Sequence, residues 1–172
     1  MIKSLDRISY LTNSLEQTEK TFSAFFNSMP SKKIVSQDRN YESLLYIFEN
    51  INFEIIKKSE DSPKEDKLSG FSMLSDDLTS LNISTSYDKY ENNEESNEKV
   101  QLVKSISINQ SPDFQLSVNE YAYSNESPTI ENNLFALDHL VLTTNKSDEL
   151  INLYEKELGI RLALDQFVEK WG

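Results

Sequence analysis

The sequence predicts an α+β protein in which a strand, a helix and further strands form a unit that recurs along the chain. Three observations predict this class. Several short segments alternate apolar and polar residues, as strands with one buried face do. Two segments carry apolar residues at helical spacing. The pattern that begins near residue 5 restarts near residue 137, which indicates an internal repeat.

The first predicted unit, residues 1–58, opens with a strand over 6–11, where apolar and polar residues alternate. Asn13-Ser14 then offers a helix cap, and the residues after it recur at helical spacing. Segment 43–56 alternates again, which predicts one or two strands with a turn near 49–50. The buried stripe of the helix is expected to consist of Leu15, Thr18, Phe22, Phe25 and Phe26.

A solvated linker is predicted over 59–67, because the charges around Pro63 are mixed and dense. The second unit, 68–123, is a degenerate copy whose helix is expected to be short. Within it, residues 88–99 offer too little apolar surface to offset the entropy of ordering, so a mobile loop is expected there. Its clearest strands are predicted over 100–109 and 114–123.

After a predicted loop over 124–135, the same pattern restarts in a third unit, 136–172. A strand is expected over 137–143, followed by a helix that Gly159 would end. The chain stops before further strands, so this third unit is expected to be truncated, as in part of a longer protein. The ungapped match with the first unit pairs Leu5-Asp6 with Leu137-Asp138, Thr12-Asn13 with Thr144-Asn145, and Phe22 with Tyr154.

Composition excludes several classes of function. The chain has 172 residues, 17 of them basic and 29 acidic, and a formal net charge of −12, whereas nucleic-acid binding needs a clustered basic excess. Apolar stretches such as 44–48 are far shorter than the ~20 residues of a membrane-spanning helix. Three glycines are too few for a phosphate-binding loop, and the absence of Cys excludes disulfides. A cytoplasmic location is expected, with no nucleic acid or membrane as partner.

The order strand, helix and three strands restarts from Leu-Asp-His-Leu-Val-Leu-Thr-Thr at 137–144 and runs on through Leu-Tyr-Glu-Lys-Glu-Leu-Gly-Ile at 153–160. In this it resembles the vicinal oxygen chelate superfamily, and most of all its glyoxalase I, bleomycin-resistance and extradiol dioxygenase group. The resemblance implies βαβββ glyoxalase-like modules that form a cupped mixed sheet with helices on its outer face, the last module being incomplete. In that superfamily paired modules enclose a divalent metal, which substrate oxygens chelate.

The superfamily's metal ligands are typically a His on the first strand of a module and a Glu on its last strand. Here His139 matches the first position in the third unit, and Glu54 matches the second position in the first unit. Arg7 stands at the His position of the first unit, and its protonated guanidinium cannot ligate a metal. The resemblance thus implies Zn, Ni or Fe at His139 in a complete protein, and no metal in this chain alone.

We expect Arg7 and Glu54 to form a salt bridge in place of a metal site, with a general-base role for Glu54 as the catalytic alternative. On the last strand of the second unit, Ser117, Asn119 and Glu120 are the candidates for the position equivalent to Glu54. The blander interpretation is a solvated strand carboxylate at Glu54. The substrate pocket is predicted to contain Arg7, Ser9 and Glu120.

Three functions stay open at this point. The first is a divalent-metal-dependent lyase or isomerase that acts on a small oxygenated metabolite in the complete protein. The second is a metal-free protein that binds or sequesters a small molecule, as bleomycin-resistance relatives do. The third is an inactive, truncated copy. The expected partners are a small-molecule ligand and either a second copy of the chain or a missing C-terminal module that completes the last sheet.

Overall fold

The computed structural model describes residues 1–36, 40–58, 63, 65–81, 83, 87–91, 100–111, 114–123, 136–142, 144 and 146–161. The described strands form an eight-stranded mixed sheet in the order β2-β3-β4-β1-β5-β8-β7-β6. They are β1 (Ile2–Leu11), β2 (Lys32–Ser36), β3 (Tyr41–Ile47), β4 (Asn52–Lys58), β5 (Lys67–Ser75), β6 (Tyr87–Glu91), β7 (Val100–Ser111) and β8 (Phe114–Tyr123).

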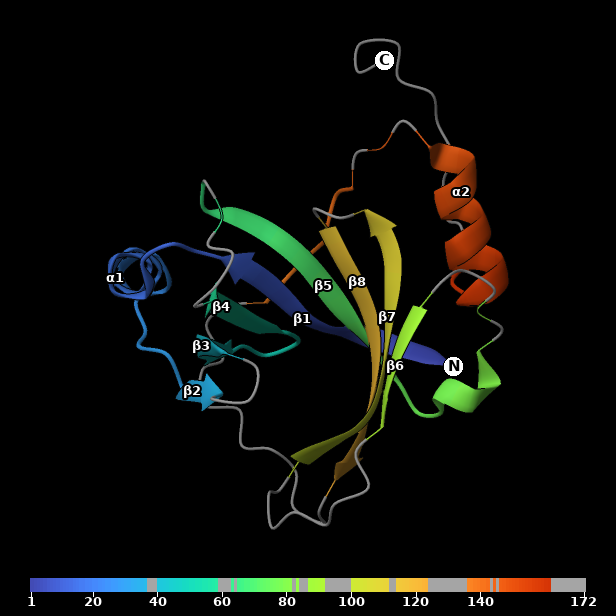
Figure 1. The fold of residues 1–172 in the computed structure, drawn as a ribbon, viewed down its shortest axis with the longest axis horizontal. Coiled ribbons are helices and arrows are strands. Elements are labelled where there is room, and N and C mark those ends of the chain that lie inside the picture. Colours follow the sequence, from blue (N-terminus) through green and yellow to red (C-terminus); the bar gives the residue numbers. More distant parts are fainter. Residues whose placement is uncertain are drawn as a thin grey trace.

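The sheet consists of two halves with the same pairing pattern. In one half β1 runs parallel to β4, and in the other β5 runs parallel to β8. The remaining strands of each half pair antiparallel, and β1 and β5 join the halves as an antiparallel central pair. The predicted α+β class, with a cupped mixed sheet and helices on its outer face, is confirmed (Figure 1).

The first half buries its outer face under α1 (Leu15–Phe26). Ser14 caps this helix by accepting a hydrogen bond from the Gln17 N–H at 3.4 Å, and Asn27 ends it in the left-handed region at φ 50°. Strand alternation sends every second side chain of β3 and β4 into this core. The buried core residues are Leu15, Phe26, Leu44, Tyr46, Phe48, Ile51, Phe53 and Ile55.

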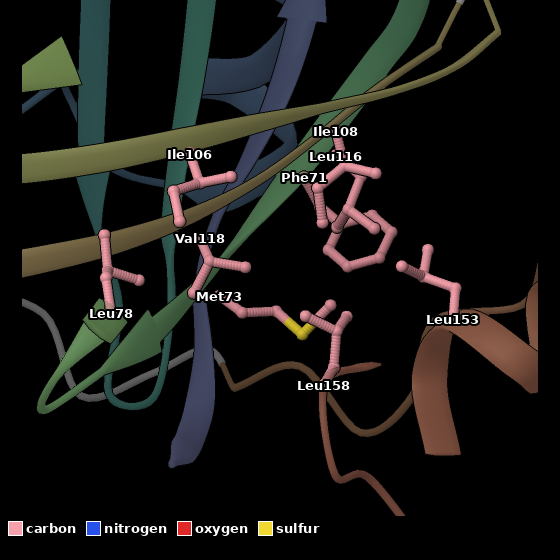
Figure 2. Packing of buried hydrophobic residues seen from close by; sticks show 9 residues of the cluster. All are labelled: Phe71, Met73, Leu78, Ile106, Ile108, Leu116, Val118, Leu153 and Leu158. Atoms are coloured by element: carbon pink, nitrogen blue, oxygen red, sulfur yellow. The ribbon is translucent and has the colours of Figure 1, made fainter. Parts of the chain in front are cut away.

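Among the described residues between β5 and β6, the second half has a 3₁₀ turn, η1 (Leu78–Ser80), at the position in the chain where the first half has α1. Its outer face is covered by the C-terminal helix instead, which comprises α2 (Ser147–Ile151) and the π-helical stretch η2 (Asn152–Glu157). Leu153 and Leu158 are each 1% exposed and pack with Phe71 and Met73 (Figure 2). The helix of the predicted third unit therefore completes the core of the second half.

The strand predicted over 137–143 does not form at the described residues 137–142. Leu137 is held by Asn50, whose amide donates to the Leu137 carbonyl at 2.8 Å and accepts from the Leu137 N–H at 2.9 Å. A side chain thus satisfies the backbone groups that a neighbouring strand would have paired. The helix does end where expected, because Gly159 adopts φ 68°.

The expected mobile loop at 88–99 is wrong over 88–91, which belong to β6 and pair with β7. Residues 92–99 and the predicted loop 124–135 lie outside the described residues. The edge strand β2 was not predicted from the sequence. Its hydrogen-bonded pairing with β3 stabilises a short segment whose own alternation of apolar and polar residues is weak. None of the helices in the described part of the chain combines the length and apolar character that crossing a lipid bilayer requires.

Candidate functional site

The inner face of the sheet is hollowed by a cavity of about 340 Å³, lined by strands β1, β4, β5 and β8. This face is polar because side chains alternate along each strand: the apolar ones point to the outer core, and the polar ones between them point into the cavity. Its charged and larger polar side chains are Arg7, Glu54, Lys58, Lys67, Gln115, Asn119 and Tyr121. Its remaining lining residues are Ser9, Leu11, Ile56, Ser69, Gly70, Phe71, Ser72 and Ser117.

The floor of the cavity depends on a close approach of β5 to β8 at Gly70. A Cβ at this position would lie 2.0 Å from the Gln115 carbonyl oxygen, which is far inside van der Waals contact. The two strands run parallel here, with Gly70 and Gln115 in register. Only a residue without a side chain permits this approach.

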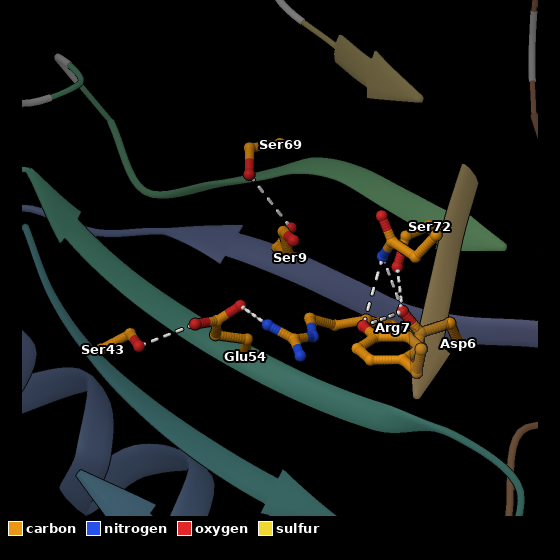
Figure 3. Close-up of polar contacts among 9 residues, drawn as sticks. Asp6, Arg7, Ser9, Ser43, Glu54, Ser69 and Ser72 are labelled. Carbon is orange, nitrogen blue, oxygen red and sulfur yellow. Dashed lines mark hydrogen bonds and ion pairs between the residues drawn. The ribbon is translucent and has the colours of Figure 1, made fainter. Parts of the chain in front are cut away.

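Arg7 and Glu54 form the ion pair expected from the sequence (Figure 3). Arg7 Nη1 donates to Glu54 Oε2 at 2.5 Å, and Glu54 Oε1 accepts from the Ser43 hydroxyl at 2.7 Å. The Glu54 side chain is 6% exposed, while the Arg7 side chain is 26% exposed. Both carboxylate oxygens of Glu54 are therefore engaged, and part of the guanidinium stays open to the cavity.

The guanidinium of Arg7 is firmly charged. Burial works to lower its pKa, but the charge of Glu54, together with Tyr121 and Asp6, outweighs burial and raises the pKa above the ordinary value. Its Nε atom is buried without a hydrogen-bond partner among the described residues. Arg7 thus has donors in excess of the single hydrogen bond that it makes to Glu54.

Asp6 organises the other wall of the cavity. The register of β1 against β5 shifts between Leu5 and Arg7, which makes Asp6 an extra residue in the strand. Asp6 Oδ2 accepts hydrogen bonds from Ser72 Oγ at 2.8 Å, from Asn119 Nδ2 at 2.8 Å and from the Tyr121 hydroxyl at 2.9 Å. These contacts fix three side chains that line the cavity.

Tyr121 is held in its neutral form. Burial raises the pKa of the Tyr121 hydroxyl, and the charge of Asp6 raises it further, while Arg7 acts in the opposite direction. The phenol thus stays protonated near neutral pH and donates a hydrogen bond to Asp6. Tyr121 therefore presents a neutral polar group to the cavity beside the charged guanidinium of Arg7.

Two of the predicted site residues lie elsewhere. Glu120 accepts from the Leu78 N–H at 2.9 Å and lies 3.9 Å from the Lys104 amine, on the β8 face that also carries Leu116 and Val118. Strand alternation puts that face toward the outer core, away from Ser117 and Asn119. Arg7, Ser9 and Glu54 are brought together in the cavity, and Glu120 is not.

His139 also lies away from the cavity. Its side chain is 72% exposed, and its Nδ1 lies 2.9 Å from Asp138 Oδ2, the acidic group of the preceding residue. In the described part of the chain, no three imidazoles or carboxylates lie close enough to hold one ion. The metal-ligand role of His139 in a longer protein stays a prediction.

The donor set of the cavity does not fit a divalent metal. Among the described lining residues the carboxylate is Glu54, which already accepts hydrogen bonds from Arg7 and Ser43. Three cationic side chains line the same space and would repel a metal cation. The other oxygen donors on this face are hydroxyls and amides, which are weak ligands for a metal of this kind.

Several residues of the site were not found from the sequence. Tyr121 follows from alternation, since it shares a face of β8 with Ser117 and Asn119. Asp6 could not be found in this way, because a bulge changes the face on which a residue lies. Lys58 precedes the predicted linker and Lys67 is its last residue, in a stretch where charged side chains are ordinarily taken as solvated, whereas the structure makes Lys67 the first residue of β5.

No protein-family model and no curated protein sequence matches this chain. Among solved structures, methylmalonyl-CoA epimerase from Mycobacterium tuberculosis is similar, with a TM-score of 0.51 and 9% identity over 69% of this chain and 88% of that protein. A substituted Streptomyces coelicolor methylmalonyl-CoA epimerase in complex with 2-nitronate-propionyl-CoA has a TM-score of 0.51 and 10% identity, covering 74% of this chain and 100% of that protein.

A methylmalonyl-CoA epimerase in complex with methylmalonyl-CoA and NH4+ matches equally well, with a TM-score of 0.51, 10% identity, and coverage of 74% of this chain and 100% of that protein. Identities this low establish a shared fold and carry nothing about activity.

Proposed function

With the vicinal oxygen chelate fold established for this chain, we propose that its concave cavity binds a small organic anion through Arg7, without a resident metal ion. The observation that carries the proposal is the Arg7–Glu54 pair. The pair fixes a partly exposed guanidinium in the cavity, and the resemblance implies that Arg7 stands where the superfamily typically has a metal-binding His. A guanidinium can hold the oxygens of a ligand where a metal would otherwise have chelated them.

The charge of the cavity supports an anionic ligand. The described residues of its lining include three basic side chains and one acidic side chain, in a chain whose formal net charge is −12. A positive cavity in a negative protein concentrates anions locally, because the low-dielectric walls focus the field. A planar carboxylate also suits the fork of N–H donors in a guanidinium better than a round ion would.

In this proposal Glu54 positions Arg7. Both of its oxygens accept hydrogen bonds, one from the guanidinium of Arg7 and one from the hydroxyl of Ser43. A carboxylate so engaged is poorly placed to take a proton from a ligand. The general-base role of Glu54 stays a prediction, as does the metal-dependent lyase or isomerase reaction.

The size and lining of the cavity support a small polar molecule. About 340 Å³ is at the lower end of the range for small-molecule sites. Ser9 and Ser117 line it with hydroxyl groups, which can donate to or accept from ligand oxygens. Two similarly folded epimerases were determined with acyl-CoA-type molecules, so this fold accommodates organic ligands.

The test is a titration of the ¹⁵N-labelled protein with aliphatic monocarboxylates, from acetate to octanoate, and with the matching primary amides as neutral controls. We expect saturable shifts at residues around Arg7, Ser9 and Ser72 for acids and none for amides. The variant Arg7→Gln/Glu54→Gln keeps two groups that can hydrogen-bond to each other and should bind at least about tenfold more weakly. Equal binding by acids and amides, or by this variant and the natural protein, would overturn the proposal.

A further inference from the structure

Three polar side chains of the cavity lining are left unpaired by the part of the protein that the structure describes. The hydroxyls of Ser9 and Ser117 and the side-chain amide of Gln115 make no hydrogen bond to any described residue. Ser72 differs from them, because it is buried and its hydroxyl donates to Asp6 Oδ2 at 2.8 Å. The three unpaired groups can each donate a hydrogen bond to a ligand and accept one from it.

The strand registers place two of these groups around Arg7. Ser9 follows Arg7 by two residues on the same face of β1, so at ~3.3 Å per residue their backbones lie roughly 7 Å apart. Arg7 is opposite Ser72 of β5, which is in turn opposite Ser117 of β8. Ser117 therefore lies two strands from Arg7, which is roughly 10 Å at the usual strand spacing.

Gln115 completes a four-cornered array over β5. Ser9 is opposite Gly70 of β5, and Gly70 is opposite Gln115 of β8. The strand between the corners offers no competing side chain, since Gly70 has none and the Ser72 hydroxyl is directed to Asp6 (Figure 3). A ligand that lies across β5 with one end at Arg7 can thus reach the other three corners.

Glu54 determines which group of a ligand fits beside Ser9. It is opposite Ser9 in the pairing of β1 with β4, and its carboxylate accepts hydrogen bonds from Arg7 and Ser43. A second anionic group of a ligand would be brought close to this carboxylate and repelled by it, whereas a ligand hydroxyl is neutral and can bond to Ser9. One carboxylate at Arg7 with neutral hydroxyls beyond it matches this distribution of charge.

The unpaired groups also select against an apolar chain. An aliphatic ligand that covers Ser9 and Ser117 would remove water from both hydroxyls and give them no new partner, whereas ligand hydroxyls would replace that water. The apolar lining residues Leu11 and Ile56 are in register with each other at the end of the cavity away from Arg7. The end that contains Arg7 therefore suits a polar ligand.

We infer that the natural ligand is a polyhydroxylated monocarboxylate, a sugar acid, whose carboxylate lies at Arg7 and whose hydroxyl groups bond to Ser9 and Ser117. This rests on the proposed function and narrows it to a substrate class. The carboxylate takes the donors that Arg7 has in excess of its hydrogen bond to Glu54. The hydroxyl groups supply partners to side chains that have none among the described residues.

The experiment compares the Kd values of gluconate and glucuronate with that of hexanoate, which has the same number of carbon atoms and no hydroxyl group, by calorimetric or NMR titration. We expect at least one of the two sugar acids to bind at least about tenfold more tightly than hexanoate, because further hydrogen bonds form. Glucose is the neutral control and should bind at least about tenfold more weakly than that sugar acid.

Ser9→Ala/Ser117→Ala removes the two hydroxyls, and we expect the preference for the sugar acid over hexanoate to fall to about threefold or less. Ser4→Ala/Ser107→Ala is the matched control. It removes two hydroxyls from strands of the same sheet, at residues that do not line the cavity, and it should leave the preference unchanged. The melting temperatures of the three proteins establish that each is folded.

The outcomes distinguish this inference from the proposed function. Arg7-dependent binding of hexanoate that is as tight as that of both sugar acids would overturn the sugar acid alone. A preference that survives in Ser9→Ala/Ser117→Ala, or that is lost in Ser4→Ala/Ser107→Ala, would do the same. Binding of glucose as tight as that of the sugar acids would overturn the Arg7 anchor and both proposals with it, as would the absence of binding by all three acids.

Discussion

Asn50 and Leu137 are 87 residues apart in the chain and bond to each other through two hydrogen bonds, at 2.8 and 2.9 Å. The Asn50 side chain pairs with the backbone of Leu137 as a neighbouring strand would. Leu137 also packs on the core of the first half, whereas Leu153 and Leu158 pack on the core of the second. The C-terminal segment therefore contacts both halves of the sheet on their outer face.

Asn50→Ala should loosen this attachment. Two exposed hydrogen bonds are lost, so we expect the free energy of local opening of the segment to fall by about 1 kcal/mol. Amide hydrogen exchange at residues 137–142 measures the effect. Asn50→Asp keeps the acceptor for the Leu137 N–H and should lose less. Unchanged exchange in Asn50→Ala would mean that the contact with the core of the first half suffices to hold the segment.

Glu54→Gln removes the counter-ion of Arg7. The amide still reaches Ser43 and Arg7 but cannot balance the guanidinium charge, and we expect a loss of about 1–3 kcal/mol in the free energy of unfolding, less than for a fully buried pair because Arg7 is partly exposed. Urea denaturation measures it. Arg7→Gln/Glu54→Gln should recover part of this loss, since no charge is left unpaired.

Glu16→Gln is the control for the ion pair, because it breaks the exposed pair of Glu16 with Lys20 and should have no measurable effect on stability. A Glu54→Gln protein as stable as the natural one would show that the Arg7–Glu54 pair contributes nothing to the fold.

Gly70→Ala should be severely destabilising. The added methyl group would overlap the Gln115 backbone, which cannot move without breaking the parallel pairing of β5 and β8, so we expect a loss of at least about 3 kcal/mol or an insoluble protein. Gly159→Ala is the comparison. No atom lies within 4 Å of its added Cβ, and only the left-handed φ of 68° opposes it, so about 1 kcal/mol is expected. Equal losses for the two variants in thermal unfolding would contradict this account of Gly70.

The buried phenol of Tyr154 makes stability depend on alkaline pH. Burial raises the pKa of Tyr154 from 10.0 to about 12. The group is neutral in both states below pH 10, so its contribution is complete there. Between about pH 10 and 12 the unfolded chain loses the proton and the folded one keeps it, and stability falls with rising pH.

Tyr154→Phe should flatten this fall by about 1–2 kcal/mol over that window, a figure discounted for the partial exposure of the ring. Denaturant unfolding at pH 9 and 11.5 measures the difference. Tyr10, Tyr46 and Tyr121 also have raised pKa values, so a residual slope is expected in the variant. A slope identical to that of the natural protein would contradict the prediction.

Local sequence patterns were sufficient to predict an element where its signals lie close together in the chain. The helix capped by Ser14 formed as predicted, because its cap and its apolar spacing lie within a few residues of each other. The prediction that Phe25 belongs to its buried stripe was wrong, since that residue is 72% exposed. Both long C-terminal strands of the sheet, β7 and β8, also lie where alternation indicates. The ion pair of Arg7 with Glu54 could be anticipated because the resemblance put opposite charges at the two ligand positions of the first unit, although the register places Glu54 opposite Ser9 and Arg7 opposite Asn52.

Patterns alone failed where the outcome depends on a partner. Segment 137–142 has the alternation of a strand, but Asn50 satisfies Leu137 and the segment forms no strand there. Residues 88–91 have the composition of a loop, yet pairing with β7 makes them a strand. A segment forms a strand only when a second segment pairs with it, so the residues of one segment do not suffice to predict a strand.

The order of residues was enough to define the α+β class, the alternating faces of the strands and the charges that stand on them, because each depends on residues that are close in the chain. The tertiary structure determined which cavity those charges line. Three features depend on contacts between distant segments: the bulge at Asp6, the approach of Gly70 to Gln115, and the packing of Leu153 on the core of the second half. The cavity exists because packing in three dimensions brings together side chains that are far apart in the chain and that no sequence pattern connects.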